Sequence, residues 1–310
     1  ADMGQHAKAF HPVTDIPSLE GRIILITGGY SGLGKQTALD LAKHGPAQIW
    51  IAGRSAKKAE STLSSLKSAA PNVSIQFLEL DLASFASVHK AVTVFLSSTT
   101  RLDILMLNAG VMGVPPGVTD EGYEMHFGIN HMGHALLVKL LRPRLDDSAR
   151  KLSNTDVRVV VVSSDGHKHP PSGGIRFDTL KSPAASLSCI SRYAQSKLAN
   201  VLYARELARR FPQWTTVSLH PGTVKTELHQ SGSSSLVLRI FQTLVLPLVG
   251  VTVEEGVRNH LWAATAADIQ NGEYYEPIGV LGKVSSLSYD MKLGQKLWKW
   301  TEEQFKDLNV

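Results

Sequence analysis

Residues 22–34 read RIILITGGYSGLG, a short apolar run followed at once by a glycine-rich loop. A continuously apolar run of this kind is typical of a strand in a parallel sheet that helices cover on both faces. A helical pattern begins at Gly34. Gly28, Gly32 and Gly34 would therefore let backbone N–H groups approach a pyrophosphate at the positive end of that helix.

The glycine spacing of this loop is T-G-x-x-x-G-x-G, which differs from the G-x-G-x-x-G of the usual dinucleotide fingerprint. Glycines that serve only a tight structural turn are therefore the alternative interpretation. The position of the loop directly after the first predicted strand favours a phosphate site.

Apolar runs and helical patterns alternate along most of the chain. A capping box of Thr252 and Glu255 opens a late helix over 256–266, and a final strand is predicted at 272–275. Alternation of this kind implies right-handed crossovers, so the sequence predicts an α/β protein with one doubly wound parallel sheet of about seven strands flanked by helices. The other strands are predicted at 22–27, 48–52, 74–79, 102–108, 157–163 and 215–220, and the other helices at 34–44, 57–69, 85–97, 123–145 and 192–210.

We expect a single domain over residues 1–310, because the chain contains neither a linker-like segment nor an internal repeat. Residues 1–20 are expected to form an N-terminal arm, since they lack the apolar stretch of a secretory signal. Residues 281–310 are expected to form a C-terminal extension. The most apolar stretch, residues 236–251, is shorter than the roughly 20 apolar residues that a membrane-spanning helix needs.

The composition argues against several other classes of protein. The net charge is +5, but the basic residues are scattered, so no nucleic-acid partner is expected. The single cysteine, Cys189, excludes an intrachain disulfide and fits a reducing compartment, so a cytoplasmic location is expected. His126, His131 and His134 lie close together, but no cysteine or carboxylate with ligand spacing accompanies them, and no metal is predicted.

Arg54 follows the second predicted strand, where a dinucleotide enzyme selects its cofactor. An acidic residue at this point binds a free ribose 2′-OH, whereas a basic one accommodates a 2′-phosphate. Arg54 could stack on the adenine and pair with that phosphate, so it favours NADP(H). A solvated arginine at the end of a strand is the alternative.

Tyr193 and Lys197 lie four residues apart on a predicted helix, so both side chains project from one face. A lysine ammonium near a phenol lowers the pKa of the tyrosine toward the working pH, as general acid/base catalysis requires. Ser163 and Ser164 end the fifth predicted strand, where a hydroxyl would sit at the carboxyl edge of the sheet beside the cofactor crevice.

Further motifs follow the other strands in order. Asp81-Leu82 follows the third strand, Asn108-Ala109-Gly110 follows the fourth, Asn130 lies in the next helix, and HPGTVKT at 220–226 follows the sixth. With these motifs added to the glycine loop and to Tyr193 and Lys197, the chain resembles the short-chain dehydrogenase/reductase family over about residues 20–280. The resemblance implies a Rossmann-type fold.

The resemblance also implies catalytic roles. Tyr193 would transfer the proton, and Ser164 would orient the substrate carbonyl, with Ser163 as its rival for this role. Lys197 would also hold the nicotinamide ribose. Asn130 would complete the tetrad by holding a water in the proton relay.

For the cofactor, the resemblance implies contacts from residues that follow five of the predicted strands and from Tyr193 and Lys197. Asp81 and Leu82 would contact the adenine, while Thr223, Val224 and Thr226 would hold the nicotinamide carboxamide and fix the ring face that delivers hydride. The expected NADP(H)-binding residues are Thr27, Gly28, Tyr30, Ser31, Gly32, Leu33, Gly34, Arg54, Asp81, Leu82, Asn108, Ala109, Gly110, Tyr193, Lys197, Pro221, Gly222, Thr223, Val224 and Thr226.

The segment NHMGH at 130–134 more specifically resembles the branch that contains retinol dehydrogenases, WW-domain oxidoreductase and protochlorophyllide reductase. Arg54 and the long interval between Ser164 and Tyr193 fit the same branch. Asp165 departs from the small apolar residue expected after the serine pair, and this departure puts the polarity of the site in question. The lack of an apolar anchor near the N-terminus argues against a membrane-bound retinol enzyme.

The expected function is hydride transfer between NADPH and a ketone or aldehyde, or the corresponding alcohol, of an apolar and fairly bulky small-molecule metabolite. Residues 228–251 fall where the family places its substrate-covering loop and helix. We expect them to line the pocket, with contact to a membrane surface or to a second copy in a homo-oligomer as the alternatives. Reduction of a carbon–carbon double bond and a non-catalytic NADP(H)-binding sensor or scaffold are the alternative functions.

Overall fold

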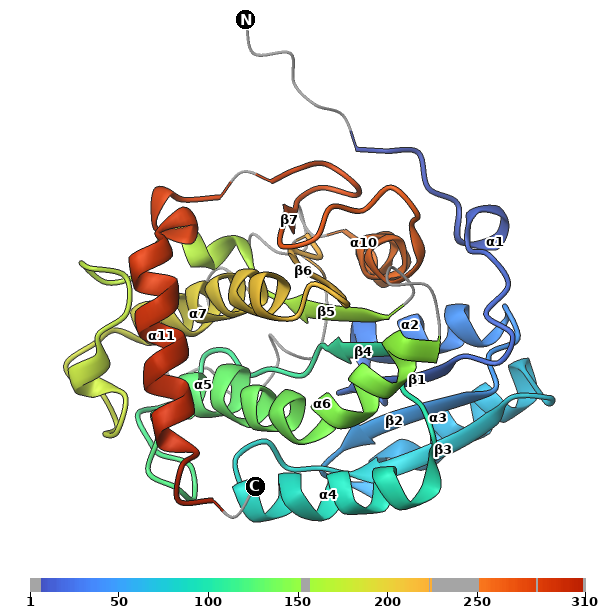
Figure 1. Ribbon diagram of the computed structural model, residues 1–310, viewed down its shortest axis with the longest axis horizontal. Coiled ribbons are helices and arrows are strands. Elements are labelled where there is room, and N and C mark those ends of the chain that lie inside the picture. The colour runs from blue at the N-terminus through green and yellow to red at the C-terminus, as the bar shows by residue number, and fades with distance from the viewer. Residues whose placement is uncertain (1–6, 152–156, 223, 225–250, 283, 309–310) are drawn as a thin grey trace, which may run out of the picture.

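A seven-stranded sheet forms the centre of the protein, in a computed structural model that describes residues 7–151, 157–222, 224, 251–282 and 284–308 (Figure 1). The strand order is β3-β2-β1-β4-β5-β6-β7, and every neighbouring pair is parallel. The order therefore reverses between β1 and β4, and ligands of open α/β sheets bind at such a switch point. The strands are β1 (Ile23–Thr27), β2 (Gln48–Gly53), β3 (Ser74–Glu79), β4 (Ile104–Leu107), β5 (Arg158–Val162), β6 (Thr215–Leu219) and β7 (Tyr274–Tyr275).

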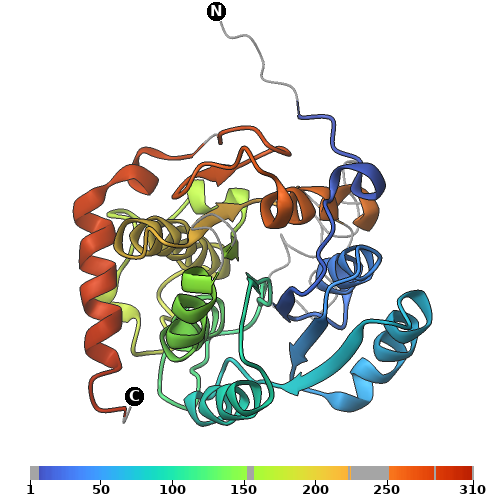
Figure 2. The ribbon, with the colours of Figure 1, turned by 45° about the vertical axis from the view of Figure 1, so that its right-hand side comes forward.

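Helices cover both faces of the sheet, as Figures 1 and 2 show. Alternate residues of β1 point to opposite faces: Ile24 joins the core beneath α2, α3 and α10, and Leu25 joins the core beneath α4, α6 and α7. This two-sided burial explains why β1 and β4 are continuously apolar, whereas the edge strand β3 alternates between exposed and buried residues. The elements are α1 (Pro12–Asp15), α2 (Gly32–Ala42), α3 (Ala56–Ala69), α4 (Phe85–Ser98), α5 (Met125–Phe127), η1 (Gly128–Met132), α6 (Gly133–Lys151), η2 (Asp165–Lys168), η3 (Phe177–Thr179), α7 (Cys189–Arg210), α10 (Val253–Thr265), η6 (Ser286–Tyr289) and α11 (Met291–Gln304).

Both flanking segments pack onto the central sheet and its helices. Of the N-terminal arm, residues 7–20 bury Phe10 and Ile16 in the core beneath α2 and α10. At the other end, α11 lies across α7 and buries Leu297 in the core on the opposite face (Figure 2). Within the described residues, no helix is long and apolar enough to cross a membrane.

The predicted helix over 123–145 is divided into α5, η1 and α6. η1 is π-helical, and the Gly133 N–H donates to the carbonyl of Gly128, five residues earlier. A π-helical turn is typical of functional sites, and this one contains Asn130. The helix predicted at 192–210 also differs from the structure. Its counterpart α7 begins at Cys189, three residues earlier, because the Ser188 hydroxyl caps the helix by accepting the N–H of Ser191.

Candidate active site

The glycine loop between β1 and α2 disfavours a side chain at two of its positions. A Cβ on Gly34 would overlap the carbonyl oxygen of Gly28 and lie 2.7 Å from Nδ2 of Asn108. Gly28 itself has φ +65°, a left-handed conformation that glycine adopts without strain. The first turn of α2 thus packs directly on the ends of β1 and β4, and its N-terminal N–H groups lie at the switch point.

Replacing Gly34 by alanine is expected to destabilise the protein and weaken NADPH binding. The added methyl group must push the Gly28 carbonyl and the Asn108 side chain apart, and overpacking of this kind costs about 1–3 kcal/mol. Thermal denaturation with and without NADPH measures both effects. Gly117→Ala is the control, because its Cβ would make only ordinary contacts. Equal melting temperatures and NADPH affinities for Gly34→Ala and the wild type would contradict this packing.

The ends of β1 and β4 are joined through Thr27. Its hydroxyl oxygen accepts the N–H groups of Asn108 and Ala109, each at 3.0 Å. In return, the Asn108 side-chain amide donates to the carbonyl of Thr27 at 2.9 Å, and its Oδ1 lies 3.3 Å from Nε2 of His260 on α10. These bonds end β4 at Leu107, one residue before the predicted end.

Arg54 is exposed at the carboxyl end of β2, directly after Gly53. Gly53 packs tightly against the ring of Tyr30, so the end of β2 lies beside the glycine loop. Tyr30 is held in turn by the Thr62 hydroxyl, which donates to its carbonyl at 2.9 Å. The structure therefore brings Arg54 and the glycine loop to the same edge of the sheet.

The other predicted adenine-side residues lie after β3. Asp81 uses its carboxylate to accept the N–H of Ala83 at 2.9 Å. Leu82 is buried, and its backbone packs against Gly133 at the start of α6. Asp81 is thus fixed in a tight turn at the same edge of the sheet as Arg54.

Tyr193 and Ser164 face each other beside η2. A Cβ on Gly166 would lie 3.2 Å from the Tyr193 ring and 3.4 Å from the Ser164 hydroxyl oxygen. Burial raises the pKa of Tyr193 to about 12, while a hydrogen bond with Ser164 acts in the opposite direction. For the chain alone, the expectation of a lowered tyrosine pKa is wrong, because desolvation of the nearly buried phenol dominates.

Lys197 lies one helical turn after Tyr193 and is buried. Its Nζ donates to the carbonyl of Val162 at 3.1 Å and lies 5.8 Å from the centre of the Tyr193 ring. Burial lowers the pKa of Lys197 to about 8. A Cβ on Gly110 would lie 3.5 Å from this Nζ, so the loop after β4 closes over the lysine.

The two serines after β5 have different surroundings. The hydroxyl of Ser163 is buried and donates to the carbonyl of Lys197 at 2.8 Å. Ser164 is half-buried, accepts the N–H of Gly166 and interacts with Tyr193. The geometry therefore favours Ser164 over Ser163 as the serine that reaches a substrate.

Asn130 connects the loop after β4 to α7. Its Oδ1 accepts the N–H of Val111 at 2.8 Å, and its Nδ2 donates to the carbonyl of Val111 at 3.1 Å and to the hydroxyl of Ser196 at 2.9 Å. The side-chain amide is thus occupied by protein partners. Sequence reasoning did not identify Ser196, although it lies inside the Tyr193–Lys197 motif.

Charged side chains surround the segment after Ser164. Asp165 pairs with Lys168, which also lies 3.3 Å from Glu276 after β7. The Tyr274 hydroxyl donates to Glu276 at 2.9 Å. The negative charge that Asp165 brings to this segment is therefore partly neutralised by Lys168.

The predicted nicotinamide segment is described only in part. Thr223, Thr226 and residues 228–250 lie outside the described residues. Val224 is buried against Gly256 of α10, where Leu33 of the glycine loop also packs. Pro221 and Gly222 are half-buried and directly follow β6 and His220, so this segment joins the same edge as the glycine loop.

The three neighbouring histidines have separate partners. His126 contacts Glu124, with Nδ1 and Oε1 2.9 Å apart, and Nε2 of His131 lies 3.1 Å from the Thr301 hydroxyl on α11. His134 contacts Thr27 on β1. Among the described residues, no group of three or more metal-binding side chains converges.

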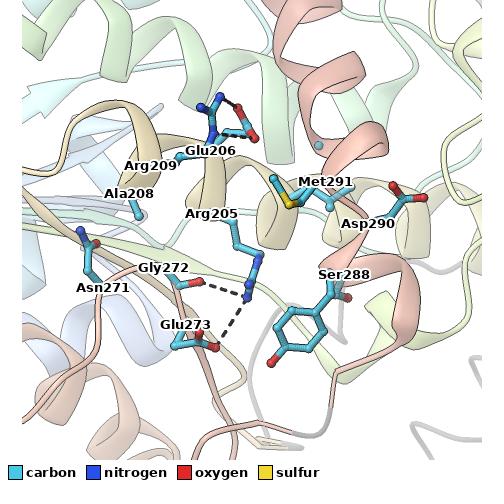
Figure 3. A pocket seen from close by; sticks show the side chains of 13 residues that line it. Arg205, Glu206, Ala208, Arg209, Asn271, Gly272, Glu273, Ser288, Asp290 and Met291 are labelled. Atoms are coloured by element: carbon cyan, nitrogen blue, oxygen red, sulfur yellow. Dashed lines mark hydrogen bonds and ion pairs between the residues drawn. The ribbon is translucent and has the colours of Figure 1, made fainter.

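A hollow of about 290 Å³ lies away from this site, between the second half of α7, η6 and the start of α11 (Figure 3). Its arginines are already paired: Arg205 with Glu273 at 3.6 Å, and Arg209 with Glu206 at 2.9 Å. Tyr193 is not among the lining residues. The hollow is therefore separate from the candidate active site.

The family model described as short chain dehydrogenase matches residues 22–236. Human retinol dehydrogenase 12 is 37% identical over 90% of this chain and 85% of its own length. An uncharacterized oxidoreductase of Schizosaccharomyces pombe is 35% identical over 95% of this chain and 88% of its own. These two similarities, which extend over most of each chain, support the resemblance carried by the motifs, and the first supports the resemblance to retinol dehydrogenases.

Solved structures share the same fold. An uncharacterized protein from Mycobacterium paratuberculosis superposes with a TM-score of 0.73 and 28% identity, over 96% of this chain and 97% of the other. The NADP complex of Pseudomonas aeruginosa RhlG superposes with a TM-score of 0.65 and 22% identity, over 90% of this chain and 100% of the other.

Proposed function

Because this chain belongs to the short-chain dehydrogenase family and is therefore an oxidoreductase, we propose that it transfers hydride between NADPH and the carbonyl carbon of a ketone or aldehyde. The observation that carries the proposal is the grouping of half-buried Ser164 with buried Tyr193 and Lys197 at the carboxyl edge of the sheet, beside the glycine loop. Bound NADPH would supply the hydride.

The described residues fit this cofactor. Gly28 and Gly34 permit a close backbone approach at the N-terminus of α2, which suits a pyrophosphate. Arg54 at the end of β2 suits a 2′-phosphate. The fold neighbour RhlG was solved with NADP, which adds support for this choice.

In the proposed reduction, Ser164 donates a hydrogen bond to the carbonyl oxygen of the substrate and orients it. Tyr193 then gives its hydroxyl proton to that oxygen as the carbon accepts hydride. Lys197 holds positive charge near Tyr193 and stabilises the phenolate that remains. In alcohol oxidation the same proton returns to Tyr193.

The apolar composition of residues 228–251 supports an apolar, fairly bulky substrate. A panel of ketones, aldehydes and enones assayed by loss of NADPH absorbance tests the reaction class. Consumption of NADPH with carbonyl compounds is expected. If only enones are turned over, and their carbon–carbon double bond is the one reduced, the protein is a double-bond reductase and this proposal is wrong.

Arg54→Asp is expected to reverse the preference for NADPH over NADH. The substitution removes the partner of the 2′-phosphate and puts a repelling carboxylate in its place, so KM for NADPH should rise about 10- to 100-fold, as for loss of a charge-assisted hydrogen bond. KM for NADH should fall, because a carboxylate here can accept from a free 2′-OH.

Lys67→Asp is the matched control for this experiment. It makes the same change of charge at an exposed position in the last turn of α3, away from the end of β2. An equal rise in KM for NADPH in both variants would show that overall charge, and not Arg54, selects the cofactor.

A further inference from the structure

His134 on α6 is a buried histidine whose two ring nitrogens contact two different parts of the candidate active site. Its Nδ1 lies 3.1 Å from the main-chain carbonyl oxygen of Asn130, and its Nε2 lies 2.9 Å from the hydroxyl oxygen of Thr27. One imidazole ring therefore links the π-helical turn that carries Asn130 to the end of β1.

The chemistry of these partners fixes the tautomer of His134. A carbonyl oxygen only accepts hydrogen bonds, so Nδ1 must carry the proton. Burial lowers the pKa of His134 to about 4, although the hydrogen bond to the Asn130 carbonyl acts in the opposite direction, so the ring is neutral at pH 7. Nε2 of a neutral ring with a protonated Nδ1 has no hydrogen and accepts from Thr27.

This tautomer completes the hydrogen bonding of Thr27. A hydroxyl has one donor and two acceptor positions, and the Thr27 oxygen already accepts the N–H groups of Asn108 and Ala109. Its proton then goes to Nε2 of His134, the nearer acceptor at 2.9 Å, and not to the carbonyl of Met106 at 3.4 Å. The neutral ring thus sets the hydroxyl orientation that holds the loop after β4.

The same ring restrains the main chain at Asn130. The side chain of Asn130 is bonded to Val111 and Ser196, and its main-chain carbonyl is the group of this residue that His134 contacts. Nδ1 of His134 fixes the direction of that carbonyl. A displacement of the His134 ring would therefore move the Asn130 backbone and the Thr27 hydroxyl together.

We propose that His134 is a positioning residue for the hydride-transfer reaction, and that its neutral Nδ1–H ring keeps Asn130 and the loop after β4 in register with the glycine loop. This role rests on the proposed function. His134 does not itself need to touch the substrate; it acts through Thr27 and Asn130.

The test compares two buried histidines on neighbouring turns. His134→Leu is expected to lower kcat about 10- to 100-fold and to weaken NADPH binding, because two hydrogen-bonding groups of the site lose their partner. His134→Gln, with one donor and one acceptor in a planar group, is expected to recover at least part of the lost kcat. His131→Leu is the control, because that ring contacts Thr301 on α11 and should lower the melting temperature alone.

Nitrogen-15 NMR of histidine-labelled wild-type protein reads the tautomer directly and needs no turnover. A protonated Nδ1 and an unprotonated Nε2 at His134 are expected from pH 6 to 8. A protonated Nε2 would overturn the proposal, as would a folded His134→Leu variant with the kcat of wild type. If no carbonyl compound is turned over, the proposed function fails. The role of His134 is then still decided by its tautomer in the wild-type protein and by the NADPH affinities of His134→Leu and His131→Leu.

Discussion

Tyr193→Phe is expected to lower kcat for carbonyl reduction by about 10²- to 10⁴-fold, the usual contribution of a general acid. The substitution removes only the hydroxyl that lies beside Ser164 and leaves the ring in its buried position. NADPH should still bind with an affinity close to that of wild type. Steady-state kinetics on whichever ketone or aldehyde the wild type reduces, together with NADPH fluorescence titration, measures both quantities.

Tyr203→Phe is the matched control for this result. Tyr203 lies on the same helix, is also buried, and its hydroxyl contacts the carbonyl of Ala135 at 3.4 Å. Its loss should affect stability and not kcat. Unchanged turnover in Tyr193→Phe with intact NADPH binding would favour the non-catalytic sensor or scaffold.

Lys197→Met is expected to lower kcat by a similar factor of about 10² or more and, at the same time, to raise the melting temperature. At neutral pH the folded protein buries an ammonium group, and this burial lowers the pKa of Lys197 from 10.5 to about 8. A methionine fills the same space without that desolvation cost. Calorimetry and kinetics on one preparation measure both changes.

The stability gain of Lys197→Met should depend on pH. Between about pH 8 and pH 10.5 the unfolded chain holds the lysine proton and the folded chain does not, so wild-type stability rises through this window relative to the variant. The difference in melting temperature should thus be largest below pH 8 and shrink toward pH 10.5. Lys139→Met, which breaks a partly exposed pair with Glu302, is the control and should show no such gain. A gap that stays constant across the window would contradict the buried charge.

The fold was predictable because the central strands β1, β4 and β5 are buried on both faces and therefore appear as mostly apolar runs, while the edge strand β3 alternates between buried and exposed residues. The break at Asn130 was not, because a π-helical turn is defined by a backbone hydrogen bond between residues five apart, and the residue types of 128–133 do not specify that bond. The strand 272–275 shortened to Tyr274–Tyr275, because Gly272 has a left-handed backbone conformation with φ +84°, which a β-strand does not contain. Periodicity reports which residues are buried, and not how the backbone is bonded at its ends.

The candidate site was predictable as a set of residues and not as a set of contacts. Ser163 and Ser164 are equivalent in the sequence, and only the packing against Lys197 and Tyr193 separates them. The raised pKa of Tyr193 depends on burial that no motif encodes. His134 lies 107 positions from Thr27, so their contact exists only once β1 and α6 have packed together.

The crossing of α11 over α6 and α7 bears on how the chain folds during synthesis. His131 of η1 and Lys139 of α6 contact Thr301 and Glu302 on α11, which leaves the ribosome only after β6, α10 and β7. Until then, the apolar side of α7 that α11 covers has no packing partner. The nascent chain therefore passes through a stage at which chaperones could bind this apolar surface. The stage ends when α11 docks.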